Sequence, residues 1–273
     1  MNHIQDSVTL SNGVEMPWFG IGVYKVEDGE EVKRAVHAAL NAGYRSIDTA
    51  AFYHNEEGVG QAIRESGIPR DELFITTKVW NDDQGYEETL RAFETSRKKL
   101  GIDIIDLYLI HWPVGGKYVD TWKAMEKLYH EGKVRAIGVS NFNIDHLEDL
   151  MRHTKVKPAI NQVELHPRLI QRELHEFCKK HGIQIEAWSP LGRARIFGDP
   201  VLVQLAEKYG KTQAQIILRW ELQNEIITIP KSVTPDRIRE NAKVFDFELS
   251  EEDIRKIDGL NADERFGANP ADF

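Results

Sequence analysis

The sequence has a single cysteine, no long apolar run and no excess of positive charge, and each shortage excludes a class of protein. Cys178 is the only cysteine among 273 residues, so no intrachain disulfide can form. No stretch approaches the ~18 apolar residues that a membrane span needs, and residues 1–6 lack the cationic and apolar parts of a signal peptide. We therefore expect a cytoplasmic protein without a membrane segment.

The net charge of -9 argues against a general binder of nucleic acid or anionic membrane. It says little about a small anionic ligand, which responds only to local charge. The chain has no His-Glu-x-x-His pattern, so a zinc hydrolase is disfavoured and no metal site is predicted. We expect a small-molecule partner.

Length and composition indicate one folded domain. Hydrophobic residues make up 41% of the chain and charged residues 29%, and no low-complexity linker interrupts it. A (β/α)8 barrel usually has about 250 residues. We predict a single domain over residues 1–273.

Apolar runs alternate with amphipathic helical patterns along nearly the whole chain. The runs predict eight strands, at residues 20–24, 45–48, 73–79, 105–111, 134–140, 159–164, 184–188 and 226–230. The helical patterns cover residues 30–42, 56–65, 86–100, 121–131, 144–152, 171–181, 202–209, 212–224 and 235–244, and a last helix begins at Ser250. Near-continuous apolar strands are typical of parallel sheets that are covered on both faces.

Eight strand–helix units predict a closed (β/α)8 TIM barrel with an N-terminal β-hairpin and extra helices. The hairpin, residues 8–16, is expected to turn at two residues, Asn12-Gly13, and to cover one end of the barrel. The alternative is an open doubly wound sheet. The sequence disfavours it because Gly20-Ile21-Gly22 does not continue into Gly-x-Gly-x-x-Gly.

Ionisable residues end three successive strands: Asp48, Lys78 and His111. Tyr53 follows Asp48 on a short loop, before a helix for which Asn55 is a candidate N-cap. In such a barrel the active site forms at the carboxyl ends of the strands. Singly, these residues could be a turn acceptor, a buried cation, a structural histidine and a surface aromatic; together they favour chemistry.

This set suits protonation of a carbonyl oxygen while a hydride reaches its carbon. We expect Lys78 to lower the pKa of Tyr53, Asp48 to hold Lys78, and His111 to orient the substrate. Tyr24, Phe52, Trp80 and Trp112 are expected to form apolar walls.

The hydride requires a cofactor. Trp188 offers a face for stacking, and Ser140, Asn141 and Gln162 offer hydrogen bonds to a carboxamide. Lys231, Ser232 and Arg237 surround the start of the last barrel helix, where Thr234 is a candidate N-cap, and predict an anion site. A solvated basic loop is the alternative.

Three segments together resemble the aldo-keto reductase family: residues 43–60 with Asp48 and Tyr53, residues 125–142 with the Arg-Ala-Ile-Gly-Val-Ser-Asn-Phe stretch, and residues 229–244 with Lys231 and Arg237. The chain is similar to the prokaryotic branch that reduces aldehydes, dicarbonyls and diketo-gluconates, including 2,5-diketo-D-gluconate and methylglyoxal reductases. The resemblance implies NADPH binding without a Rossmann fold, with Asp48, Tyr53, Lys78 and His111 as the catalytic tetrad. We also expect a monomer.

The resemblance also implies two sets of binding residues. Those for the cofactor are Gly22, Val23, Asp48, Ser140, Asn141, Gln162, Trp188, Ser189, Leu191, Lys231, Ser232, Val233, Arg237, Glu240 and Asn241. Those for the substrate are Tyr24, Tyr53, Trp80, His111 and Trp112.

The segment 112–120 and the tail after Asn261 are short relative to many members of the family. We therefore expect a shallow, open pocket for small activated carbonyls. Two alternatives stay open: a nucleotide-binding sensor or regulatory subunit with little turnover, and a Schiff-base lyase that uses Lys78.

Overall fold

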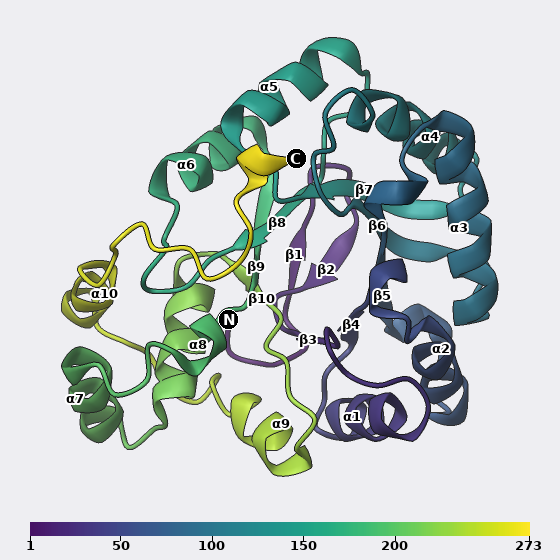
Figure 1. The fold of residues 1–273 in the computed structure, drawn as a ribbon. Helices are drawn as coiled ribbons and strands as arrows, with labels where there is room; N and C mark the ends of the chain where they lie inside the picture. The colour runs from purple at the N-terminus through teal and green to yellow at the C-terminus, as the bar shows by residue number, and fades with distance from the viewer.

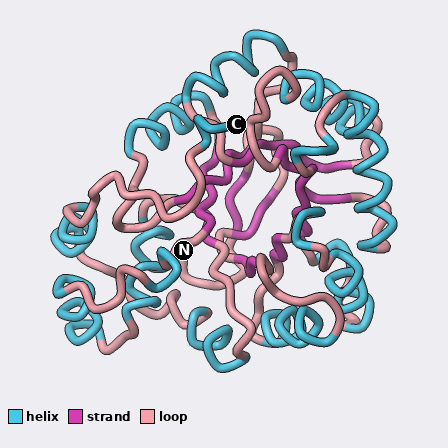
Figure 2. The backbone as a smooth tube through the Cα atoms, viewed as in Figure 1, coloured by secondary structure: helices cyan, strands magenta, loops and turns pink.

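The structure is a computed structural model that describes all 273 residues, and its centre is a sheet of eight parallel strands (Figures 1 and 2). The strands follow one another in chain order: β3 (Gly20–Gly22), β4 (Ser46–Asp48), β5 (Phe74–Val79), β6 (Ile105–Ile110), β7 (Val134–Ser140), β8 (Ile160–Glu164), β9 (Gln184–Trp188) and β10 (Ile227–Thr228). Each coincides with a predicted apolar run.

The two edge strands of this sheet meet and close it into a barrel. Parallel bridges join Phe19 to Thr228 and Gly22 to Lys231, and the N–H of Thr228 donates to the carbonyl of Trp18 over 3.1 Å. The closed barrel is thus confirmed over the open sheet.

Ten helices surround the strands (Figure 1). They are α1 (Glu30–Asn41), α2 (Glu56–Glu65), α3 (Tyr86–Leu100), α4 (Tyr118–His130), α5 (Ile144–His153), α6 (Arg172–His181), α7 (Pro200–Tyr209), α8 (Gln213–Gln223), α9 (Pro235–Asn241) and α10 (Glu251–Asp258). None of them has the length and apolar content to cross a membrane.

The N-terminal hairpin, β1 (Ser7–Thr9) and β2 (Glu15–Pro17), covers one end of the barrel. Leu10 and Met16 pack there against barrel residues such as Leu107. The predicted two-residue turn is wrong: Leu10 donates to the carbonyl of Val14 over 2.8 Å, so three residues form the loop. Gly13 has φ +86, which lets the loop close with the extra residue.

Two predicted N-cap residues, Asn55 and Thr234, stand at the N-cap positions of α2 and α9, but neither side chain makes a capping hydrogen bond. The amide of Asn55 instead donates to the carbonyls of Val23 and Val26. Ser250 does cap α10, because its Oγ accepts from the N–H of Asp253 over 3.2 Å. Asn55 therefore ties the start of α2 to the loop after β3.

Candidate active site

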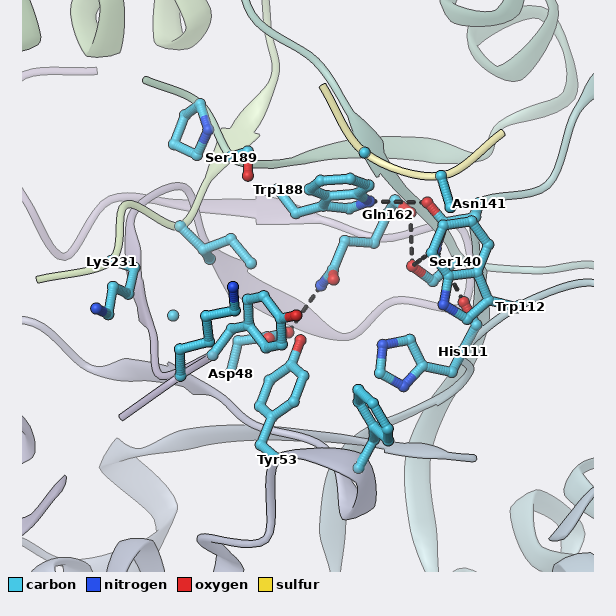
Figure 3. A pocket seen from close by; sticks show the side chains of 18 of the residues that line it. Asp48, Tyr53, His111, Trp112, Ser140, Asn141, Gln162, Trp188, Ser189 and Lys231 are labelled. Carbon is cyan, nitrogen blue, oxygen red and sulfur yellow. Dashed lines mark hydrogen bonds between the residues drawn. The ribbon is translucent and has the colours of Figure 1, made fainter. Parts of the chain in front are cut away.

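The carboxyl ends of the strands surround one cavity of about 540 Å³. Asp48 from β4 and His111 after β6 line it, together with Tyr53 at the end of the short 3-10 helix η1 (Ala51–Tyr53). Lys78 of β5 is buried directly behind them. Figure 3 shows Tyr53, His111 and Trp188 pointing into the same space. The structure thus brings the four predicted catalytic residues together.

The Lys78 ammonium is completely buried and fully hydrogen-bonded. Its Nζ donates to Asp48 Oδ1 over 2.6 Å, to the carbonyl of Thr49 over 2.9 Å and to the Tyr53 hydroxyl over 3.2 Å. Burial alone would lower the pKa of Lys78, but Asp48 and Tyr53 outweigh it and raise that pKa. A charged amine with all three protons donated is no nucleophile, which disfavours the Schiff-base lyase.

The Tyr53 phenol does not have the lowered pKa that the sequence predicted. Burial raises the pKa of Tyr53 to about 12, against the opposing effect of Lys78, and Asp48 raises it further. The reason is that desolvation of a phenolate costs more here than one neighbouring ammonium recovers. Tyr53 is therefore a protonated donor at neutral pH.

His111 is neutral. Burial, and secondly the charge of Lys78, hold the pKa of His111 well below its usual range. Its Nδ1 is buried without a hydrogen-bond partner, and its ring meets the Tyr53 ring edge-on at 5.7 Å. A neutral imidazole here can hydrogen-bond an uncharged carbonyl oxygen.

Aromatic side chains form the walls, as predicted, with one addition. Phe52 stacks on Trp80 with ring centroids 3.8 Å apart. Phe273 in the tail stacks on Trp112 at 4.3 Å and also lines the cavity. The tail, expected to contribute little because it is short, therefore forms part of the cavity wall, and the segment after α10 runs in front of β8 and β9 (Figure 1).

Glu164 anchors that tail. Its buried carboxylate accepts from the N–H groups of Phe266 over 2.7 Å and Gly267 over 3.0 Å. Gly267 packs against Trp188 so closely that a Cβ would lie 2.4 Å from its ring. The tail thus also buttresses the ring of Trp188.

The predicted carboxamide ligands are arranged around Trp188. The indole N–H of Trp188 donates to Asn141 Oδ1 over 2.8 Å, and Asn141 Nδ2 donates to the carbonyl of His111 and to Ser140 Oγ. Ser140 Oγ in turn donates to the carbonyl of Gln162 over 2.7 Å. Asn141 therefore fixes the ring of Trp188, and both protons of its amide are already donated within the protein.

The other predicted cofactor residues divide into two groups. Gly22, Ser189, Leu191 and Lys231 line the cavity, whereas Val23, Ser232, Val233, Arg237, Glu240 and Asn241 do not. Val23 is buried, and its N–H donates to the carbonyl of Asp48 over 3.1 Å. The remainder of the second group lies beyond Lys231, on α9 and the loop before it, where Arg237 and Glu240 are exposed.

Two cations that the sequence reading missed also line the cavity: Lys25 and Arg193. Both lie in loops and have left-handed backbones, with φ 57 and φ 55. The only signal in the sequence was that Lys25 directly follows the predicted wall residue Tyr24.

The architecture and the site together define a barrel oxidoreductase. Residues 19–262 match the aldo/keto reductase family, and the chain belongs to that family. It is 62% identical over 267 residues to the glyoxal reductase of Bacillus subtilis (strain 168), covering 98% of this chain and 97% of the relative. It is 50% identical to the methylglyoxal reductase DkgA of Salmonella typhimurium (strain LT2), with 97% of each chain covered.

A solved structure of a Gox0644 mutant in complex with NADPH superposes with a TM-score of 0.94. The two chains are 46% identical, and 98% of each is covered. This likeness extends over the whole barrel.

Proposed function

We propose that this protein uses NADPH to reduce aldehydes and activated ketones to alcohols. One observation carries the proposal: the protonated Tyr53 hydroxyl lies 3.2 Å from the fully buried ammonium of Lys78. The neutral side chain of His111 and the indole of Trp188, which is held by a hydrogen bond, line the same cavity. The Tyr53 hydroxyl can therefore donate a proton, and the adjacent ammonium stabilises the phenolate that remains.

The donor groups of the cavity suit a dinucleotide. The Trp188 face is held for stacking by Asn141 on one side and Gly267 on the other. Gly22 has no side chain to fill its wall, where a Cβ would lie 3.0 Å from the carbonyl of Ile229. Lys25, Arg193 and Lys231 provide positive charge for phosphate groups. We assign Lys231, Ser232 and Arg237 to the 2′-phosphate.

Bound NADPH supplies the hydride for the carbonyl carbon. Tyr53 donates its hydroxyl proton to the carbonyl oxygen, and Lys78 stabilises the phenolate that remains. Asp48 holds Lys78 in place, 2.6 Å away. His111 has no acceptor for a proton on Nδ1, so we place its proton on the other ring nitrogen, Nε2, which can donate to the same oxygen.

The substrates we propose are small dicarbonyls such as methylglyoxal and glyoxal, aromatic aldehydes and diketo-sugar acids. The aromatic walls at Phe52, Trp80 and Trp112 suit a flat or small carbonyl. The names of the two bacterial relatives, glyoxal reductase and methylglyoxal reductase, support the same class. An electron-poor carbonyl also needs less assistance from a weak acid such as Tyr53.

The test is NADPH oxidation by the purified protein across methylglyoxal, glyoxal, aromatic aldehydes, short aldoses and 2,5-diketo-gluconate. We expect turnover with the activated aldehydes. Tight NADPH binding with no turnover on any of them would contradict the reductase and favour the sensor or regulatory subunit.

We also propose that the active unit is one monomer with one domain over residues 1–273, located in the cytoplasm. For the single domain, the support is one hydrophobic core of 52 residues that runs from Phe19 to Ile257. The single cysteine is buried and free, as suits a reducing compartment. Size-exclusion chromatography with light scattering and cell fractionation test these points.

A further inference from the structure

A second buried carboxyl lies behind the catalytic aspartate. Glu186 of β9 is only 1% exposed, and it is paired in register with Gln162 of β8. Gln162 Nε2 donates to Glu186 Oε2 over 2.9 Å and to Asp48 Oδ2 over 2.7 Å; Figure 3 shows the bond to Asp48. One amide nitrogen therefore bridges two acids inside the barrel.

No cation is available to neutralise Glu186. The charged groups that act on it are Asp48 and Lys78, and all three protons of Lys78 are donated to Asp48, Thr49 and Tyr53. Glu186 Oε1 is buried without any partner. A carboxylate in this place would be desolvated beside another negative charge, so the carboxyl is held as the neutral acid. Burial first, and Asp48 second, raise the pKa of Glu186.

This arrangement decides how the amide of Gln162 is turned. Because Asp48 is the salt-bridge partner of Lys78 and can only accept, the amide must present its N–H₂ to the two acids. Its carbonyl oxygen then makes no hydrogen bond to the protein, in a residue that lines the cavity. Gln162 thus offers an acceptor to the carboxamide N–H₂ of a bound nicotinamide.

We propose that Glu186 is a positioning residue of the reductase: its neutral carboxyl fixes the amide of Gln162, and its ionisation places a second negative charge behind Asp48 that weakens Tyr53 as an acid. This inference rests on the proposed function.

The sign of the effect follows from charge. A negative charge at Glu186 disfavours the phenolate of Tyr53, so Tyr53 holds its proton more tightly. Proton-transfer rates follow Brønsted behaviour, so each unit of added pKa slows the step about threefold. The wild-type rate of carbonyl reduction therefore falls as Glu186 ionises above neutral pH.

The test compares Glu186→Gln with the matched control Glu221→Gln. The amide in Glu186→Gln has the shape of the neutral acid but cannot ionise. Glu221 of α8 is also completely buried with both carboxylate oxygens unpartnered, and burial also raises its pKa well above the usual range. It does not line the cavity.

The first readout is the pH profile of kcat/KM for methylglyoxal reduction. We expect Glu186→Gln to have the wild-type kcat/KM at pH 6. At high pH, where kcat/KM of the wild type falls, that of Glu186→Gln should stay higher by about threefold or more. Glu221→Gln should keep the wild-type profile. Identical profiles for all three proteins, or an equal loss by Glu186→Gln at every pH, would overturn the inference.

The second readout needs no activity: the free energy of unfolding of the cofactor-free proteins against pH. The folded pKa of Glu186 lies above its unfolded value, so unfolding releases a proton and stability falls as pH rises from about 4.5 through the folded pKa. Glu186→Gln and Glu221→Gln should each gain stability relative to the wild type over that window. If Glu186→Gln gains none, Glu186 is not a neutral buried acid and the inference fails.

The third readout is the dissociation constant of NADPH, measured by tryptophan fluorescence. In Glu186→Ala the amide of Gln162 loses a hydrogen-bond partner and is no longer held in one orientation. NADPH binding should therefore weaken about tenfold, which corresponds to the loss of one hydrogen bond. Glu186→Gln at pH 6 should bind NADPH as the wild type does. Weakening by both variants alike would mean that Glu186 is a packing residue only. If the wild type binds NADPH but reduces no carbonyl, the proposed function is contradicted. The stability measurement would still test whether Glu186 is a neutral buried acid.

Discussion

Lys78 Nζ lies 2.6 Å from Asp48 Oδ1, and the two side chains are 0% and 3% exposed. Removal of one partner of a buried ion pair leaves the other charge uncompensated, which typically costs about 3–5 kcal/mol. We therefore expect Lys78→Met to lower the free energy of unfolding by about that amount and to abolish most reduction, since Tyr53 also loses the cation beside its hydroxyl.

Denaturant unfolding and NADPH oxidation measure the two effects of Lys78→Met. The control is Lys179→Met, which breaks a surface pair with Glu225 whose partners are 71% and 60% exposed and should cost less than about 1 kcal/mol. A loss of activity with an unchanged melt would refute the role of the buried pair in stability.

Tyr53→Phe should reduce single-turnover carbonyl reduction by about 10²–10⁴-fold, the usual contribution of a general acid. NADPH binding should stay close to the wild-type value, because the ring that packs against Tyr24 at 5.1 Å is retained. Tyr24→Phe is the matched control and should change the rate little. Turnover of Tyr53→Phe within about threefold of the wild type, well below that range, would remove Tyr53 from the proton transfer.

The barrel could be predicted because the sequence pattern of a buried parallel strand is local. Strands covered on both faces are continuous apolar runs, and Asp48, Lys78 and His111 each stand within one residue of the end of a strand. Their convergence follows from the rule that all carboxyl ends of a parallel barrel lie at one end. These three positions could therefore be predicted without any knowledge of long-range contacts.

What the sequence missed depends on three-dimensional balance. The pKa of Tyr53 is raised because the effect of burial is larger than the opposing effect of Lys78. The spacing of residues along the sequence does not show which of the two effects is larger. The tail, anchored by Glu164 at Phe266 and Gly267, brings Phe273 onto Trp112, which is a long-range contact. Arg193 lines the cavity from a loop where its backbone is left-handed, a conformation that the sequence does not reveal.

The pocket should prefer small activated carbonyls to bulky ketones. Phe52 stacked on Trp80 forms one wall, and Trp112 stacked on Phe273 forms another. Walls made of so few side chains offer little binding energy to the parts of a large substrate that lie far from the carbonyl. We expect a higher kcat/KM for methylglyoxal or an aromatic aldehyde than for a steroid ketone, and Phe273→Ala should narrow that difference. A steroid ketone preferred by the wild type would contradict this account of the walls.

NADPH should be preferred over NADH, with Arg237 carrying much of the difference. The two cofactors differ only in the 2′-phosphate, and a hydrogen bond to a charged group contributes roughly 1.5–3 kcal/mol. Arg237 is exposed on α9, so water and salt reduce that value. Arg237→Ala should still weaken NADPH binding at least tenfold, ~1.4 kcal/mol, and barely change NADH binding.

The matched control for Arg237→Ala lies on the same helix. Arg239 is paired with Asp236 three residues before it, so Arg239→Ala should leave both cofactors bound as in the wild type. The loss of NADPH affinity in Arg237→Ala should also shrink as salt is raised, because ions screen an exposed charge pair. Titrations of both cofactors by tryptophan fluorescence at low and high salt measure this. An equal loss of NADPH and NADH would mean that Arg237 supports the pyrophosphate or α9 itself, and the 2′-phosphate would then have to be assigned to Lys231 and Ser232 alone.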